Sequence, residues 1–141
     1  MSTPLRIFVD SDAVVSSLLS SSGAANYLLD QPNLFFIISD ISYQEIKTVV
    51  ERLGLAEKTV NNLVEEKLKI VKLGKQEKSK EKFFGYVTDA GDAHIVEGAV
   101  RAKARFLISY NVRHFRVDKI KSDFGILLFT PAHFLQYLRS L

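Results

Sequence analysis

The sequence contains no cysteine and no tryptophan, and only three prolines among its 141 residues. Without cysteine the chain cannot form a disulfide framework, a thiolate zinc site, an iron–sulfur cluster or a cysteine nucleophile. Long hydrophobic runs are also missing, since the longest, residues 34–38, is far too short to cross a bilayer. The first residues show no secretory pattern and reach an acid at Asp10. We therefore expect a cytoplasmic protein with no membrane partner.

The overall composition is that of a globular domain. Hydrophobic residues make up 47% of the chain and charged residues 25%, proportions that exclude wholesale disorder. A chain of 141 residues can bury its own core, and it contains no internal repeat. We expect residues 1–141 to form a single domain.

The small excess of positive charge is concentrated in one segment. The chain carries a net charge of +3, and residues 65–82 alone carry seven lysines against four glutamates. One interpretation is a solvated, lysine-rich turn. The other is a basic lip that attracts an anionic polymer.

Short apolar segments alternate with helical patterns along the chain. The apolar segments predict five strands, at residues 5–10, 34–39, 69–73, 104–109 and 125–129. Cap residues and apolar spacing predict helices at residues 13–19, 24–29, 40–54, 55–67, 88–103 and 131–138. This alternation predicts an α/β protein, a three-layer αβα sandwich with a central, mostly parallel five-stranded sheet.

Polar side chains follow the predicted strands at the edge where ligands bind in parallel sheets. The first strand leads into Asp10, Ser11 and Asp12, and Glu45 lies one turn into the helix after the second strand. A late strand closes with Ser109 and Asn111, and the helix before it carries Asp89 and Asp92 in its first turn.

Most of these acids also have an ordinary explanation as helix caps or solvated first-turn residues. Asp10 is harder to explain in this way, because it directly follows the apolar residues 7–9 at the mouth of a buried strand. Carboxylates that converge there would repel one another, and a divalent cation would remove the repulsion. Oxygen-only ligands suit Mg²⁺ or Mn²⁺.

The three histidines do not indicate a zinc site. His94, His114 and His133 form no pair at helical spacing. We expect His133 on the surface of the last helix, whereas His114 follows Asn111 closely enough to reach the site. The side on which His94 lies is left open.

Four segments in this order resemble a PIN domain: residues 8–14, 42–46, 92–99 and 106–111. The tail at residues 130–135 resembles the end of a toxin branch of that family. The resemblance implies a metal-dependent nuclease, mostly acting on RNA, and a VapC-like toxin paired with a small antitoxin. It places the family's first three acids at Asp10, Glu45 and Asp92.

Two positions depart from the family's pattern. The family commonly has Asn where this chain has Asp12, and its fourth acid usually falls where this chain has Asn111. Asp12 or Asp89 could compensate for the missing acid.

The resemblance also implies roles for individual residues. Asp10 and Asp92 would bind Mg²⁺ or Mn²⁺, Glu45 would bind metal or orient water, and Asn111 would hold a metal-bound water. Ser11 and Ser109 would support the ligands. The basic side chains expected at the RNA backbone are Arg113, Arg116, Lys75 and Lys78. The apolar residues of the first two helices could supply a homodimer face.

Two alternatives remain. A weakened fourth acid is compatible with an inactive PIN-like nucleic-acid-binding or scaffold module. Residues 8–14 also match the first motif of haloacid-dehalogenase-type phosphatases, although the acidic pair that those enzymes need after a late strand is missing.

Overall fold

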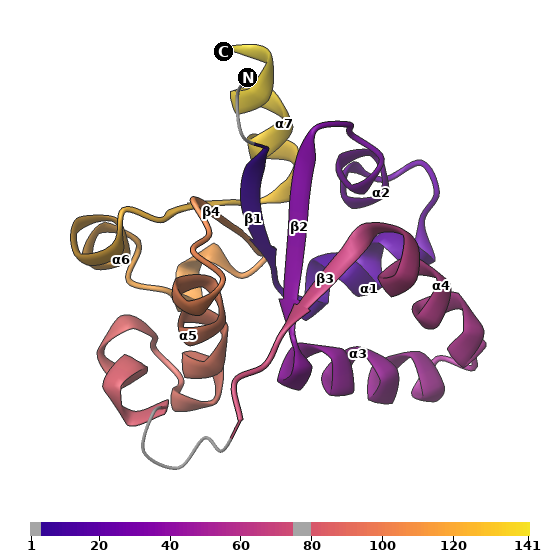
Figure 1. The fold of residues 1–141 in the computed structure, drawn as a ribbon, viewed down its shortest axis with the longest axis horizontal. Helices are drawn as coiled ribbons and strands as arrows, with labels where there is room; N and C mark the ends of the chain where they lie inside the picture. Colours follow the sequence, from indigo (N-terminus) through magenta and orange to yellow (C-terminus); the bar gives the residue numbers. More distant parts are fainter. Residues whose placement is uncertain (1–3, 75–79) are drawn as a thin grey trace.

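The structure, a computed structural model, describes residues 4–74 and 80–141. One five-stranded sheet forms its centre (Figure 1). The strands are β1 (Leu5–Val9), β2 (Leu34–Ser39), β3 (Leu68–Val71), β4 (Phe106–Ile108) and β5 (Leu127–Phe129). Their spatial order is β3-β2-β1-β4-β5, and every neighbouring pair is parallel. The prediction of a parallel αβα sandwich is confirmed.

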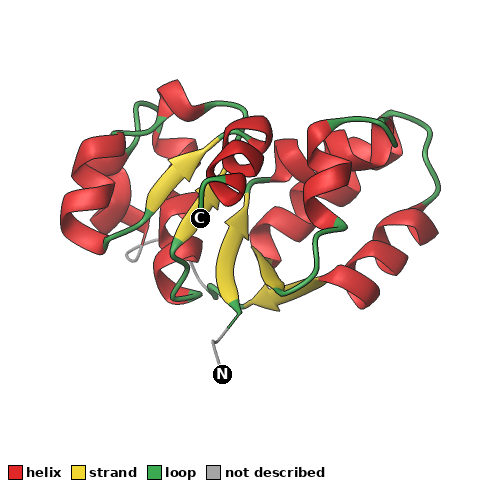
Figure 2. Ribbon diagram, turned by 90° about the horizontal axis from the view of Figure 1, so that it is seen from above, coloured by secondary structure: helices red, strands yellow, loops and turns green. Residues whose placement is uncertain are grey.

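Helices cover both faces of the sheet, which Figure 2 shows from above. One face packs against α1 (Ser11–Leu19), α2 (Ala24–Leu29), α3 (Asp40–Arg52), α4 (Glu57–Lys67) and α7 (Pro131–Arg139). The other face packs against α5 (Ala93–Arg101), α6 (Val117–Phe124) and a 3₁₀ helix, η1 (Lys80–Tyr86). Within the described ranges, no helix is long and apolar enough to cross a membrane.

Strands β1, β2 and β4 carry buried apolar residues on both faces because each face has its own core. In β1, Ile7 and Val9 belong to the core under α1–α4, whereas Phe8 belongs to the core under α5. All three side chains are almost fully buried. Successive strand residues point to opposite faces, so a strand between two helical layers must be apolar throughout.

Three local predictions differ from the structure. Residues 117–124 form α6, which the sequence pattern did not indicate, because Ile120 is the helix's only buried residue. The helix expected from residue 88 begins as a 3₁₀ turn at Ala90–Asp92, and α5 starts only at Ala93. Residues 80–86 form the 3₁₀ helix η1, where the sequence pattern predicted no helix.

The chain order creates a switch point between β1 and β4. From β1 the chain moves outward through β2 and β3, and then returns to add β4 and β5 on the other side of β1. In open parallel sheets, ligands bind beyond the carboxyl ends of the strands at this reversal. The residues that follow β1 and β4 are therefore placed side by side at the expected ligand site.

Candidate metal centre at the switch point

Asp10 leaves β1 at the boundary with β4. Its backbone N–H donates to the Ile108 carbonyl at 2.9 Å, which continues the pairing of the two strands. Asp10 is the N-cap residue of α1, but its side chain makes no N-capping hydrogen bond to the helix. The carboxylate is 6% exposed, and its Oδ2 accepts a hydrogen bond from Ser109 Oγ at 2.8 Å. Ser11 Oγ lies 3.4 Å from Oδ1. The carboxylate is therefore oriented by two serine side chains and not by a helix cap.

Asp12 bridges the start of α1 and the end of β4. Its Oδ2 accepts from the Tyr110 N–H at 3.1 Å and from Asn111 Nδ2 at 3.1 Å. Ser109 Oγ lies 3.3 Å from the same oxygen and accepts from the Asn111 N–H at 3.0 Å. Among the described residues, the buried Oδ1 of Asp12 has no hydrogen-bond partner. A buried, unpaired carboxylate oxygen is costly, and a bound cation would satisfy it.

Glu45 comes from the first part of α3 and meets α5 through His94. The Oε1 atom of Glu45 lies 3.2 Å from His94 Nε2, and the His94 side chain is 8% exposed. The buried ring fixes the direction of a carboxylate that is itself half exposed. The sequence analysis left open the side on which His94 lies. The feature that could have indicated its role is its position two residues after Asp92.

Asp92 ends the 3₁₀ turn that leads into α5. Its Oδ2 lies 3.9 Å from Nδ1 of His114, so the His114 ring lies beside Asp92. Asp89 is exposed and accepts from the Gly91 N–H at 2.8 Å, which is the capping role. His133 is exposed on α7, as predicted.

Burial and mutual repulsion hinder the ionisation of Asp10. The pKa of Asp10 is raised to about 7, mainly by burial and then by the charges of Asp12 and Glu45. Hydrogen bonds from Ser109 and from the Ser11 backbone act in the opposite direction. The negative charge of Asp10 is thus incompletely compensated by the protein.

Two further acids share this electrostatic environment. Burial is the main cause that raises the pKa of Asp12, with a smaller contribution from the charge of Asp92. Burial also raises the pKa of Asp92, and the charges of Asp89 and Glu45 add to it, while His114 and His94 oppose them. The acids therefore act on one another, as carboxylates around a cation site do.

The donor set suits a hard divalent cation. In the described part of the chain, no three His, Asp or Glu side chains are close enough to hold one ion by themselves. Mg²⁺ commonly binds one or two carboxylates and keeps several waters. Asp10, with its uncompensated charge, and Asp12, with its unpaired Oδ1, are compatible with such a site.

The remaining predicted residues have different positions. Arg113 and Arg116 are exposed on the segment after β4, next to Asn111, and form no ion pair with a described residue. Lys75 and Lys78 lie outside the described residues. Asp40 accepts from the N–H groups of Ile41 and Leu73, so its role is to join α3 to the segment after β3.

The apolar residues of α1 and α2, which were proposed as a homodimer face, are only partly exposed. Val14, Leu28 and Leu29 belong to the core, whereas Leu19 and Tyr27 are more than half exposed. Leu19 borders a hollow of about 410 Å³ that also includes Ser11, Asp12, Val15, Ser16 and Val49. An apolar surface therefore adjoins the acidic site.

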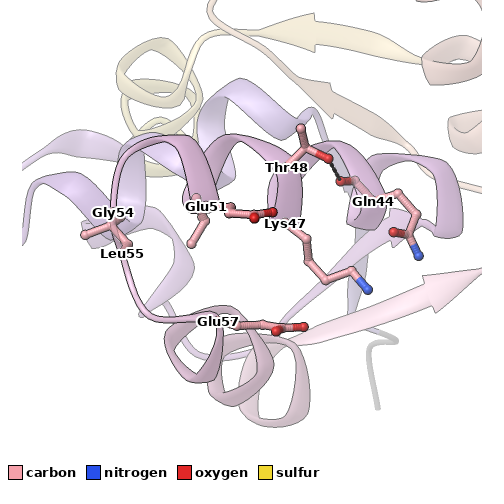
Figure 3. A pocket seen from close by; sticks show the side chains of 8 residues that line it. Gln44, Lys47, Thr48, Glu51, Gly54, Leu55 and Glu57 are labelled. Carbon is pink, nitrogen blue, oxygen red and sulfur yellow. Dashed lines mark hydrogen bonds between the residues drawn. The ribbon is translucent and has the colours of Figure 1, made fainter.

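A larger hollow of about 520 Å³ lies between α3 and α4 (Figure 3). It is lined by residues of both charges, including Lys47, Glu51 and Glu57, and by none of the site acids. Its size alone therefore does not identify a functional site.

The parallel sheet and its flanking helices define the class, an α/β protein, and the acids at its switch point form the candidate ligand site. The sequence profile of the PIN domain matches residues 6–113. This range includes Asp10, Asp12, Glu45, Asp92 and Asn111. The chain belongs to the PIN domain family.

Solved structures share the fold at low sequence identity. The structure of FitAB bound to an IR36 DNA fragment superimposes with a TM-score of 0.53 and 19% identity, over 89% of this chain and 94% of that one. The PIN domain endonuclease Utp24 superimposes with a TM-score of 0.50 and 15% identity, over 92% of this chain and 86% of that one. The search of curated proteins finds no significant match.

Proposed function

We propose that this protein is an Mg²⁺- or Mn²⁺-dependent endoribonuclease that hydrolyses phosphodiester bonds in RNA. The observation that carries the proposal is the gathering of Asp10, Asp12, Glu45 and Asp92 at the switch point of a PIN domain. PIN domains are a family of nucleases. The mutual repulsion of these acids calls for a cation at this place.

Each residue has a role in this proposal. Asp10 and Asp92 would hold the cation, which when bound lowers the pKa of a water and offsets charge on the phosphate. Ser109 holds Asp10 by its hydrogen bond, and Ser11 supports the same carboxylate. Glu45, held by the buried His94 ring, would accept the proton of the attacking water.

Basic residues would bind the substrate backbone beside the acids. Arg113 and Arg116 are exposed near Asn111 and would contact phosphates without reading the base sequence. Lys75 and Lys78 remain expected contributors. Asp89, an exposed cap 2.8 Å from the Gly91 N–H, would act through its charge on Asp92.

Asp12 and Asn111 form an exchanged pair in this chain. The family's pattern has an amide at the first position and an acid at the second, and here the two groups change places. The Asn111 amide nitrogen lies 3.1 Å from Oδ2 of Asp12. Asp12 would then supply the fourth negative charge, one hydrogen bond away from Asn111, and Asn111 would hold a metal-bound water.

The toxin role, in the cytoplasm and with a small antitoxin as partner, is part of the same proposal. It is supported by the resemblance of residues 130–135 to a toxin branch of the family. The exposed apolar residues Leu19 and Tyr27 are available to an antitoxin or to a second copy of the chain. Mass measurement in solution would distinguish a homodimer from a monomer.

The direct test is cleavage of single-stranded RNA with Mg²⁺ or Mn²⁺, and its loss in EDTA. Asp10→Asn and Asp92→Asn should each abolish cleavage, because each removes a charge that holds the cation. Asp118→Asn, the same change at an exposed position on α6, should leave cleavage intact. Cleavage that survives in both site variants would contradict the assignment and indicate a contaminating nuclease.

One observation favours a second candidate, a catalytically weakened nucleic-acid-binding or scaffold module. No three acidic or histidine side chains of the described segments form a ready-made metal cluster. Titration with Mn²⁺ separates the two functions, because the weakened module should bind RNA without binding the ion. The phosphatase alternative has no support once the chain belongs to the PIN domain family.

A further inference from the structure

A basic hollow lies at the edge of the sheet opposite the acids. It has a volume of about 510 Å³ and is lined by Pro4, Leu5, Arg6, Phe35, Lys103 and Arg105. Arg6 and Phe35 are register partners at the start of β1 and β2, and Arg105 directly precedes β4. Asp10 follows the other end of β1, so the hollow is separated from the acidic site by the length of the strand.

The charge of this hollow is positive and uncompensated. Arg6, Lys103 and Arg105 line it together with no acidic residue. None of the three forms an ion pair with another residue in the ranges 4–74 and 80–141. Cations gathered in this way repel one another, and a bound anion would relieve the repulsion.

Arg6 is held in place before any ligand binds. Its Nε donates to the Ala102 carbonyl at 2.7 Å, and its guanidinium lies 4.8 Å from the centroid of the Phe35 ring. The Arg105 N–H donates to the Arg6 carbonyl at 2.9 Å, which fixes the two arginines relative to each other. A guanidinium oriented in this way loses little freedom when it binds a phosphate.

Lys103 occupies a position where glycine would be more stable. It ends α5 in the left-handed conformation, with φ of 54°, and its N–H donates to the Val100 carbonyl. The chain ends α3 in the same way with Gly54, at φ of 73°. A lysine there has a conformational cost that glycine avoids. Its side chain adds a third positive charge to the two arginines that line the hollow.

We propose that Arg6, Lys103 and Arg105 form a second binding site for the phosphates of a single-stranded RNA. The proposal rests on the proposed function only in the choice of RNA as the polyanion. Contacts of this kind bind the backbone without reading its sequence. Because the site lies across the sheet from the acids, a strand that reaches both must extend well past the cleaved bond. Long RNA can therefore contact both edges, whereas short RNA can contact only one.

The test measures the binding of fluorescein-labelled RNA to the full chain in EDTA, where the proposed cleavage cannot proceed. The double variant Lys103→Gly/Arg105→Gln should bind an RNA of about 30 nucleotides roughly five-fold more weakly, with a salt slope smaller by about 1.4. An RNA of about five nucleotides can contact only one edge, so it should bind the unchanged protein more weakly than the long RNA. The matched control is Lys58→Gln/Lys121→Gln, which removes two exposed charges elsewhere and should bind like the unchanged protein.

A second measurement separates binding from helix termination. Lys103→Gly alone should raise the melting temperature and weaken the binding of long RNA. A raised melting temperature with unchanged RNA affinity would show that Lys103 only terminates α5, and would overturn the proposal. Full competition by inorganic phosphate at millimolar concentration would overturn the assignment to a polymer. Failure of cleavage with length-dependent binding intact would refute the nuclease and leave this site standing.

Discussion

Asp10 affects both the stability of the fold and the charge of the candidate site. Its carboxylate is buried between β1 and β4, and burial raises the pKa of Asp10 to about 7. An unfolded chain would give this group a pKa of about 3.9. The native protein therefore keeps the proton of Asp10 over a pH range where the unfolded chain has lost it. A bound cation would reverse this preference by stabilising the carboxylate.

The first residue-scale prediction concerns the pH dependence of stability without metal. As pH rises from about 4 to about 7, the free energy of unfolding should fall, by at most about 1.4 kcal/mol per pH unit from Asp10. Asp10→Asn removes this contribution and should flatten the curve. Urea unfolding in EDTA at several pH values measures it, with Asp118→Asn as control. An unchanged slope in Asp10→Asn would contradict the burial argument.

The second residue-scale prediction concerns the exchanged pair of Asp12 and Asn111. Asp12→Asn removes a charge and should weaken Mn²⁺ binding by roughly ten-fold or more. The double variant Asp12→Asn/Asn111→Asp returns the charge across a 3.1 Å hydrogen bond and should recover much of that loss. Calorimetric titration with Mn²⁺ measures both. Equal affinity in the single variant and the unchanged protein would exclude Asp12 from the metal site.

At the scale of the element, α5 carries site residues and must pack close to β1. A Cβ atom at Gly98 would lie 2.6 Å from Cζ of the buried Phe8 ring. The glycine therefore lets α5 approach the sheet, and the helix holds His94 in its first turn directly after Asp92. The close approach of one helix sets the position of two side chains of the site.

The element-scale prediction is that Gly98→Ala lowers the free energy of unfolding by about 1–3 kcal/mol, because the Phe8 ring must move in a packed core. Gly85→Ala is the control, since its Cβ would meet only the flexible end of Lys119 at 3.0 Å. Phe8→Leu combined with Gly98→Ala should recover part of the loss. Thermal unfolding measures all three variants, and equal melting temperatures for the two alanine variants would contradict the packing argument.

At the scale of the whole molecule, charges of opposite sign gather at opposite edges of one sheet. Acids lie beyond the carboxyl ends of β1 and β4, and Arg6, Lys103 and Arg105 lie at the amino ends. The net charge of +3 hides this division. The basic residues at the amino ends of the strands attract a polyanion. The acids at the carboxyl ends repel it unless a bound cation offsets their charge.

The whole-molecule prediction is that Mn²⁺ stabilises the native protein. An ion that binds only the folded state adds about 2.7 kcal/mol at a concentration one hundred times its dissociation constant. The melting temperature should rise with Mn²⁺ and return to its starting value in EDTA. Asp10→Asn should respond weakly, because it lacks the buried charge. An equal rise in Asp10→Asn would place the ion elsewhere.

Local patterns predicted most of the elements but few of the contacts. Most strands were predicted because they are apolar on both faces, and the strand near residue 70 because its residues alternate. Asp10 was recognised because it interrupts an apolar run. Helix α6 was not predicted because Ile120 is its only buried residue. His94 was not predicted as a site residue because its partner, Glu45, lies in a different helix. Pairings between distant segments leave no trace in local spacing.

The sequence by itself determined the parallel sheet, the order of the acids along the chain and the family to which the chain belongs. Alternating apolar strands and capped helices are local properties, and so they can be read without coordinates. Only the tertiary structure decided that β4 lies beside β1. That pairing brings Asn111 to Asp12 and also brings Arg105 to Arg6. Both sites depend on contacts between residues about one hundred positions apart, and the packing of the sheet alone creates them.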